Sequence, residues 1–266
     1  NLGKEVATGY AALGGGHCAA GTKIPRSSAT PGYARAGTII GMRVLGIDAY
    51  TKGWIGIELD CGTFLAAHIA DHLTMLLSAV HDIQAVGIDM PLGLVETGWR
   101  QADLDARAFV GKRRGAVFLV PPRAVWKQED TWYDDSGEQA NQRCRQLTGH
   151  GLARQTWGLH AKLREANECL ATNLHEVHPE ASFAAMNGQP LEHSKISWTG
   201  HITRRALLAK HGIDLPDQLG DAGNAGFDDV LDAAAAAWSA HRIAIGHAGR
   251  LPTEPSPGQE HISIQY

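Results

Sequence analysis

The sequence contains little cysteine, and no two cysteines lie close together. Its 266 residues include four cysteines, none of them in a Cys-x-x-Cys pair. This excludes a disulfide scaffold, argues against a clustered zinc site and suits a reducing compartment, so we predict a cytoplasmic protein. No run of about 18 apolar residues occurs, so the sequence predicts no membrane span.

Positive charge is also scarce. The formal net charge is −4 at pH 7 and charged residues make up 20% of the chain. This composition is typical of a globular protein and excludes a strongly basic nucleic-acid coat. Any nucleic-acid site must therefore be local or must use metal ions to offset its own acidity. The Gly-x-Ser-x-Gly nucleophile motif and the phosphate-binding P-loop motif are both absent.

Residues 1–41 differ from the rest of the chain. They are rich in glycine and alanine, and their apolar residues do not recur with the spacing of a helix or a strand. Such a segment cannot bury enough apolar surface to offset the entropy lost on ordering. We predict a disordered or non-native segment over residues 1–41 and one folded domain over residues 42–266.

The folded part begins with a pattern of short strands. Apolar runs separated by turn residues predict strands at residues 44–48, 54–59 and 63–69, joined as an antiparallel meander. Asp71 is expected to cap a helix over residues 72–81, and a fourth strand follows. Because strand, helix and strand in succession imply a crossover, this fourth strand should pair in parallel within a mixed sheet.

The remainder of the chain is mostly helical. The fourth strand is expected at residues 84–89, and a helical insertion at about residues 91–173. The other predicted elements are helices at 100–110 and 138–171 (broken near 149–151), a strand at 174–177, helices at 199–211 and 228–245, and an edge strand at 261–266. This order predicts an α/β ribonuclease H-like fold. In it, three antiparallel strands are followed by parallel strands, helices cover both faces, and the helical insertion follows strand four.

Four aspartates stand at the ends of predicted elements. Asp48 ends the first strand and Asp89 the fourth, and both follow Gly-Ile, which allows close backbone approach. Since these strands are neighbours in the predicted fold, the two carboxylates should meet at one end of the sheet. Asp229 and Asp232 are spaced i, i+3 and share one face of the last helix. Hard oxygen ligands gathered in this way suit Mg²⁺ or Mn²⁺, and two such ions can activate a water and stabilise the leaving oxygen of a phosphodiester.

Each of these carboxylates also has a simpler interpretation. An aspartate at a strand end is commonly a turn residue. Asp228 is expected to be the N-cap of the last helix, and Asp229 would complement the dipole of the first turn. Asp232 precedes a buried alanine-rich segment, so its charge needs a partner or a metal. Taken together, the set favours function, and we predict Asp48, Asp89, Asp229 and Asp232 as catalytic metal ligands.

Two further groups of polar residues are candidates. Glu180 follows a short predicted strand, where it would bind metal, orient a water or simply begin a helix. Residues 100–127 include seven basic residues, which would hold a phosphate backbone, with Trp126, Trp132 and Tyr133 stacking on bases. Acidic residues follow directly, so a solvated and mutually paired surface is the alternative.

Several stretches of the sequence match a known family. They are Gly46-Ile47-Asp48 with Gly53-Trp54, residues 87–94, Arg100 to Asp103 with Arg107, Val117-Phe118 with Pro121 and Arg123, His175 to Glu180 with Phe183, Lys195, and Asp228-Asp229 with Asp232. On these residues the chain resembles the family called domain of unknown function 429, whose members are predicted nucleases of ribonuclease H-like fold.

The resemblance implies a metal-dependent nuclease acting on DNA or RNA. It implies metal ligands on the first strand, the fourth strand and the last helix, which are Asp48, Asp89, Asp229 and Asp232 here. The substrate-binding residues predicted with this function are Arg100, Arg107, Arg113, Arg123, Lys127 and Lys195. One alternative is a catalytically inactive nucleic-acid or nucleotide-binding module of the same fold. A less favoured alternative is an actin-like phosphotransferase, because such enzymes consist of two duplicated halves and the folded part is too short for both.

Overall fold

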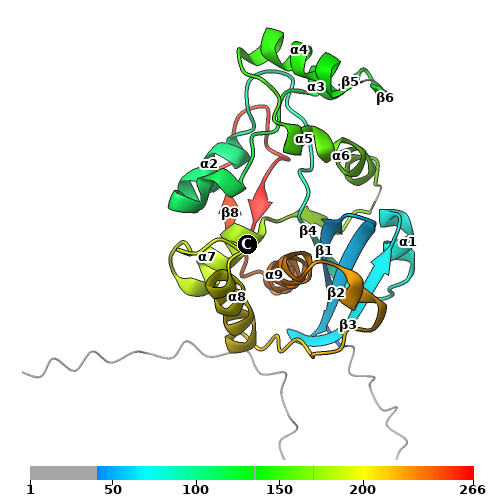
Figure 1. Ribbon diagram of the computed structural model, residues 1–266, viewed down its shortest axis with the longest axis vertical. Coiled ribbons are helices and arrows are strands. Elements are labelled where there is room, and N and C mark those ends of the chain that lie inside the picture. Colours follow the sequence, from blue (N-terminus) through cyan, green and yellow to red (C-terminus); the bar gives the residue numbers. More distant parts are fainter. Residues whose placement is uncertain (1–40, 135, 170) are drawn as a thin grey trace, which may run out of the picture. The chain divides into compact units, whose positions relative to one another are not determined.

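A computed structural model describes residues 41–134, 136–169 and 171–266. Residues 41–266 form one unit built on a five-stranded sheet with the order β3-β2-β1-β4-β7 (Figure 1). Its strands are β1 (Arg43–Tyr50), β2 (Gly53–Asp60), β3 (Thr63–Ala70), β4 (Ile83–Ile88) and β7 (Leu174–Glu176). The prediction for residues 1–41 falls, apart from Gly41, outside the described residues and stays a prediction.

The sheet is mixed, as the sequence predicts. β1 pairs antiparallel with β2, and β2 with β3, whereas β1 pairs parallel with β4, and β4 with β7. In the β1–β4 pair Ile47 lies opposite Ile88, and the Asp89 amide donates to the Ile47 carbonyl at 2.8 Å. The residues that follow this pair, Asp48 and Asp89, therefore stand side by side at the same end of the sheet.

Helices cover both faces of the sheet. One face packs against α7 (Pro179–Asn187), α8 (Trp198–Lys210) and α9 (Phe227–Ala244), with a short 3₁₀ helix, η2 (Gly220–Asn224), between α8 and α9. Figure 1 shows α9 lying beside β1. The opposite face packs against α1 (Leu73–Ser78) and part of the insertion. None of the helices described in residues 41–266 has the length and apolarity needed to cross a membrane.

The predicted helical insertion lies between β4 and β7. Its elements are α2 (Gln101–Phe109), the 3₁₀ helix η1 (Gly111–Ala116), α3 (Arg123–Trp126), the hairpin β5 (Lys127–Gln128) and β6 (Thr131–Trp132), α4 (Gly137–Thr148), α5 (Arg154–Gly158) and α6 (His160–Asn167). The break predicted near residues 149–151 is confirmed, because α4 ends at Gly149 with a left-handed φ of 75°. The hairpin was not predicted, since two-residue strands show no alternation.

Both predicted N-caps are wrong. The N-cap of α1 is His72 and not Asp71, and no side chain caps this helix. The N-cap of α9 is Gly226, where the backbone is still extended, so Asp228 already lies inside the first helical turn. In both cases the helix begins one or two residues away from the residue that composition favours as a cap.

Two elements near the end of the chain differ from expectation. Helix α7 was expected only as an alternative at Glu180, although Pro179 stands at its first position, where proline is favoured. The predicted edge strand at residues 261–266 is reduced to β9 (Ile264–Gln265), which pairs with β8 (Arg250–Leu251). A single parallel bridge between Val177 and Gln265 joins this pair to the end of β7.

Candidate metal centre

Glycines bring α9 unusually close to the sheet. A Cβ on Gly46 would lie 1.9 Å from the Ala237 nitrogen, and one on Gly87 would lie 2.6 Å from the Ala236 carbonyl oxygen. The helix presents small side chains there, because residues 233–237 are all alanine and all buried. The close backbone approach expected at the Gly-Ile-Asp motifs is therefore confirmed for both β1 and β4. It brings the turn of α9 that precedes these alanines over the ends of the two strands.

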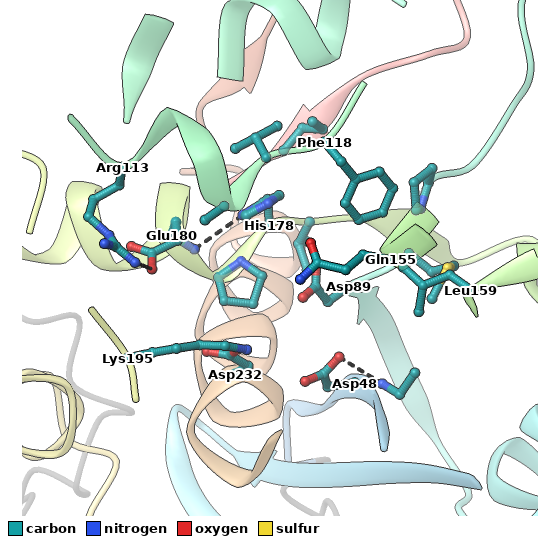
Figure 2. A pocket seen from close by; sticks show the side chains of 18 of the residues that line it. Asp48, Asp89, Arg113, Phe118, Gln155, Leu159, His178, Glu180, Lys195 and Asp232 are labelled. Atoms are coloured by element: carbon teal, nitrogen blue, oxygen red, sulfur yellow. Dashed lines mark hydrogen bonds and ion pairs between the residues drawn. The ribbon is translucent and has the colours of Figure 1, made fainter. Parts of the chain in front are cut away.

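Three aspartates meet where α9 crosses these strand ends. One carboxylate oxygen from each of Asp48, Asp89 and Asp232 lies within 4.8 Å of the other two. Asp48 and Asp232 are only 6% and 4% exposed, and Asp89 is half-buried. Figure 2 shows the three side chains, from β1, the end of β4 and α9, pointing into one space. We call these three residues the carboxylate cluster.

The carboxylate cluster has few hydrogen-bond donors. The Ala49 amide donates to Asp48 Oδ1 at 2.7 Å, and Lys195 Nζ donates to Asp232 Oδ2 at 2.6 Å. Among the described residues no hydrogen bond to the Asp89 carboxylate is found. Because buried carboxylates normally accept several hydrogen bonds, this arrangement leaves oxygen lone pairs available for a ligand.

The electrostatics of the cluster disfavour three negative charges. Burial raises the pKa of Asp48 well above its ordinary value, and the neighbouring Asp89 and Asp232 raise it further. Burial also raises the pKa of Asp89 and that of Asp232 to about 7, which Lys195 opposes. A cation placed among the three oxygens would remove this repulsion, so the donor set fits a metal ion that prefers oxygen ligands.

The other two predicted catalytic residues lie beside the cluster. Asp229 lines the same cleft but does not belong to the three-carboxylate group. Glu180 also lines the cleft, and its Oε1 accepts from Arg204 at 2.7 Å and from Arg113 at 3.3 Å. The second oxygen of Glu180 is buried and has no hydrogen-bond partner. Glu180 is thus held mainly by arginines and begins helix α7, one of the possibilities its sequence position left open.

The cluster opens into a cleft of about 390 Å³. Charged side chains line one side, and Figure 2 shows Arg113, Glu180 and Lys195 there. The other side, beyond Asp89, carries Phe118, Gln155 and Leu159. The cleft therefore combines a cluster of carboxylates, two cations and a largely apolar wall in one space.

The predicted substrate-binding residues are not brought together. Arg113 and Lys195 line the cleft, whereas Arg107 lies on a separate shallow depression with Arg114. Arg123 pairs with Glu96 at 2.7 Å, and Lys127 lies over the Trp132 ring at 5.5 Å from its centroid.

Arg100 has a different place from the other predicted substrate-binding residues. Its side chain is completely buried and is bonded to Glu176. Base stacking by Trp126 and Trp132 is contradicted, because both indoles are buried in the core with 0% and 6% exposure. The stretch of residues 100–127 therefore serves largely to build the insertion.

Two further residues are partners of the site, and the sequence indicated only one of them, His178, which lies in the matched stretch from His175 to Glu180. Arg204 is 1% exposed and holds Glu180, yet a single arginine in an amphipathic helix gives no signal of such a role. His178 is half-buried and lines the cleft, desolvation lowers its pKa, and its Nδ1 accepts from the Glu180 amide at 3.2 Å. Its role as the N-cap of α7 was not predicted, since that role depends on where the helix begins.

The chain matches the family described as "Protein of unknown function (DUF429)" over residues 46–256. This match covers most of the chain, so the protein belongs to that family. Both the carboxylate cluster and Lys195 lie within the matched residues. Neither a curated protein nor a solved structure matches the chain.

Proposed function

We propose that this protein is a divalent-metal-dependent nuclease with a ribonuclease H-like domain, using Mg²⁺ or Mn²⁺. One observation carries the proposal, the meeting of three buried aspartates from β1, the end of β4 and α9 within 4.8 Å. The sheet order β3-β2-β1-β4-β7, with α9 packed across β1, is consistent with that fold. The oxygen-only donor set favours a hard divalent cation over zinc.

The residues of the cleft have separate parts in this reaction. Asp48, Asp89 and Asp232 would hold the ion, which when bound lowers the pKa of a coordinated water and polarises a phosphoryl oxygen. Arg113 and Lys195 line the same cleft and are placed to attract the phosphate of a nucleic acid. The buried and unpartnered Glu180 oxygen is an acceptor for a water in the cleft.

A cleavage assay with the full chain tests the proposal. Single-stranded and double-stranded DNA, RNA and a branched junction are each incubated with Mg²⁺, with Mn²⁺ or with a chelator. We expect metal-dependent cleavage that leaves a 3′-hydroxyl and falls by about two orders of magnitude or more in Asp48→Asn.

The matched control for this assay is Asp130→Asn. Asp130 is exposed in the β5–β6 turn, so this variant makes the same charge change away from the cleft. It should retain full activity. Cleavage that persists in chelator, or that survives Asp48→Asn, would contradict the proposal.

A further inference from the structure

Lys195 forms an ion pair with the carboxylate cluster. Its Nζ lies 2.6 Å from Asp232 Oδ2 and 3.4 Å from Asp228 Oδ2, so it bridges two carboxylates on the first turns of α9. Its ammonium also lines the cleft into which the cluster opens. Figure 2 shows the Lys195 side chain extended over Asp232 from the side opposite Asp48.

The segment that carries Lys195 is fixed by a tight turn. The Ser197 amide and the Ser197 hydroxyl both donate to the Ser194 carbonyl, at 3.0 and 2.7 Å. The Ser197 hydroxyl in turn caps α8 by accepting from the Gly200 amide at 3.1 Å. A Cβ on Gly200 would lie 1.9 Å from the Ser194 carbonyl oxygen, so this turn packs directly on the helix.

Arg204 holds the same segment from the other side. It donates to the His193 carbonyl at 3.1 Å while it pairs with Glu180 at 2.7 Å. The backbone on both sides of Lys195 is thus anchored to α8 and, through Glu180, to α7. A lysine on an anchored turn keeps its ammonium near one place, which a lysine on a free loop does not.

The number of clustered ligands fits one ion. The carboxylate cluster provides three oxygens within the reach of a single cation, and the described residues contain no second group of this kind. Of the remaining carboxylates on α9, Asp228 pairs with Lys195, and Asp229 lines the cleft outside the three-carboxylate group. A second divalent ion bound there would have to displace the ammonium from Asp232.

We propose that this site holds one divalent ion and that Lys195 is a built-in cation taking the place of a second ion. This inference rests on the proposed function and replaces the two-ion arrangement expected from the sequence. The ammonium acts electrostatically, by neutralising Asp232 and Asp228 and by attracting a phosphate oxygen in the cleft, and it transfers no proton.

Counting bound Mn²⁺ tests this inference without measuring turnover. The full chain is stripped of metal and titrated with Mn²⁺ by calorimetry, and bound Mn²⁺ is examined by electron paramagnetic resonance. We expect one ion in the wild type with a spectrum of isolated Mn²⁺. Lys195→Met exposes the Asp228 and Asp232 carboxylates together, so it should bind two ions with the spectrum of a spin-coupled pair. Lys195→Arg retains the charge and should bind one.

Lys210→Met provides the matched control. Lys210 is exposed at the last turn of α8, and its replacement should leave the count at one. Two ions in the wild type, or one ion in Lys195→Met, would contradict the proposal that Lys195 takes the place of a second ion, but would leave the nuclease proposal intact. If neither the wild type nor any variant binds Mn²⁺, the metal-dependent function itself fails.

Discussion

Two clusters of buried charge lie close to each other in the fold, yet they are built differently. In the first, which we call the arginine network, Arg100 Nη2 donates to both Glu176 oxygens at 2.6 and 2.5 Å. The Leu92 amide donates to Glu176 at 2.7 Å, and the Val120 amide donates to Asp103 at 2.9 Å. In the carboxylate cluster, by contrast, one lysine and one backbone amide serve three carboxylates.

The neighbours of each acid show what the difference means. Burial raises the pKa of Glu176 to about 7, but Arg100 and the Leu92 amide act to lower it. Burial raises the pKa of Asp48 as well, and there Asp89 and Asp232 raise it further, against a smaller opposing effect of Lys195. Buried acids that stabilise a fold are surrounded by donors, whereas the three acids of the carboxylate cluster share one cation, Lys195. The first arrangement is typical of structure and the second of a binding site.

The largest expected effect comes from breaking the arginine network. Arg100→Met leaves Glu176 and Asp103 buried without their cation, and we expect a loss of about 3–5 kcal/mol of unfolding free energy. Urea unfolding measures this loss directly. Arg164→Met is the control, because Arg164 makes an exposed pair with Glu168 and its loss should cost less than about 1 kcal/mol.

Urea unfolding of Asp48→Asn extends the comparison to the carboxylate cluster. Removing one of three mutually repelling acids should leave the metal-free protein as stable as before or more stable. A small effect of Arg100→Met together with a large loss in Asp48→Asn would reverse the assignment of the two clusters. Arg100 would then be free for another role, and the carboxylates would be structural.

These two clusters also show how far sequence alone reaches. The Gly-Ile-Asp motifs and the order of the strands were sufficient to predict that Asp48 and Asp89 would meet at one end of the sheet. That carboxylates of the last helix would join them was implied by the family resemblance, which did not separate Asp232 from Asp229. The order of the elements also predicted the mixed sheet and its crossover. Arg100 could not be placed, since whether a basic residue faces solvent or core depends on how the insertion folds back over β7, which is encoded in contacts distant in sequence.

The caps and the turn at Lys195 were also beyond prediction, for a related reason. Gly226 replaces Asp228 as the N-cap because a helix begins where the backbone leaves the extended region, and composition constrains that point only within a residue or two. The ion pair of Lys195 with Asp232 joins residues 37 positions apart through a short irregular turn. No periodic signal marks such a turn in the sequence.

An effect of intermediate size on stability is expected when the pH of the metal-free protein is changed. The pKa values of Asp89 and Asp232 are raised to about 7 in the fold, against about 4 in an unfolded chain. At these two groups the folded state therefore binds protons more tightly, so their contribution to stability is greatest at low pH and is lost as the pH rises toward and through 7. Melting should occur at a lower temperature at pH 8 than at pH 6, and Asp232→Asn should reduce this difference.

Adding Mn²⁺ should reverse the pH dependence of stability, so that the protein melts at a higher temperature at pH 8 than at pH 6. Metal binding requires the deprotonated carboxylates, so the stabilisation by Mn²⁺ should grow from pH 6 to pH 8. At a hundredfold excess over Kd the gain is about 2.7 kcal/mol. Asp130→Asn should show the wild-type behaviour at both pH values. A metal-free protein whose stability rises with pH over this range would mean that the cluster is already neutralised by protein groups.

The smallest effect on stability is expected from Asp228→Asn. This substitution tests which of the two ion pairs of Lys195, with Asp228 or with Asp232, matters for metal binding. Its carboxylate is 3.4 Å from Lys195 Nζ, whereas that of Asp232 is 2.6 Å away and far more buried. Asp228→Asn removes a charge from the first turn of α9, which should cost about 0.3–1 kcal/mol through the helix dipole. Because Asp232 still holds the ammonium, the variant should bind one Mn²⁺ and keep the full metal-induced rise in melting temperature. Asp232→Asn, compared in the same melts, should lose most of that rise. An equal loss in both variants would make Asp228 a metal ligand and would place the ion, rather than Lys195, between the two α9 carboxylates.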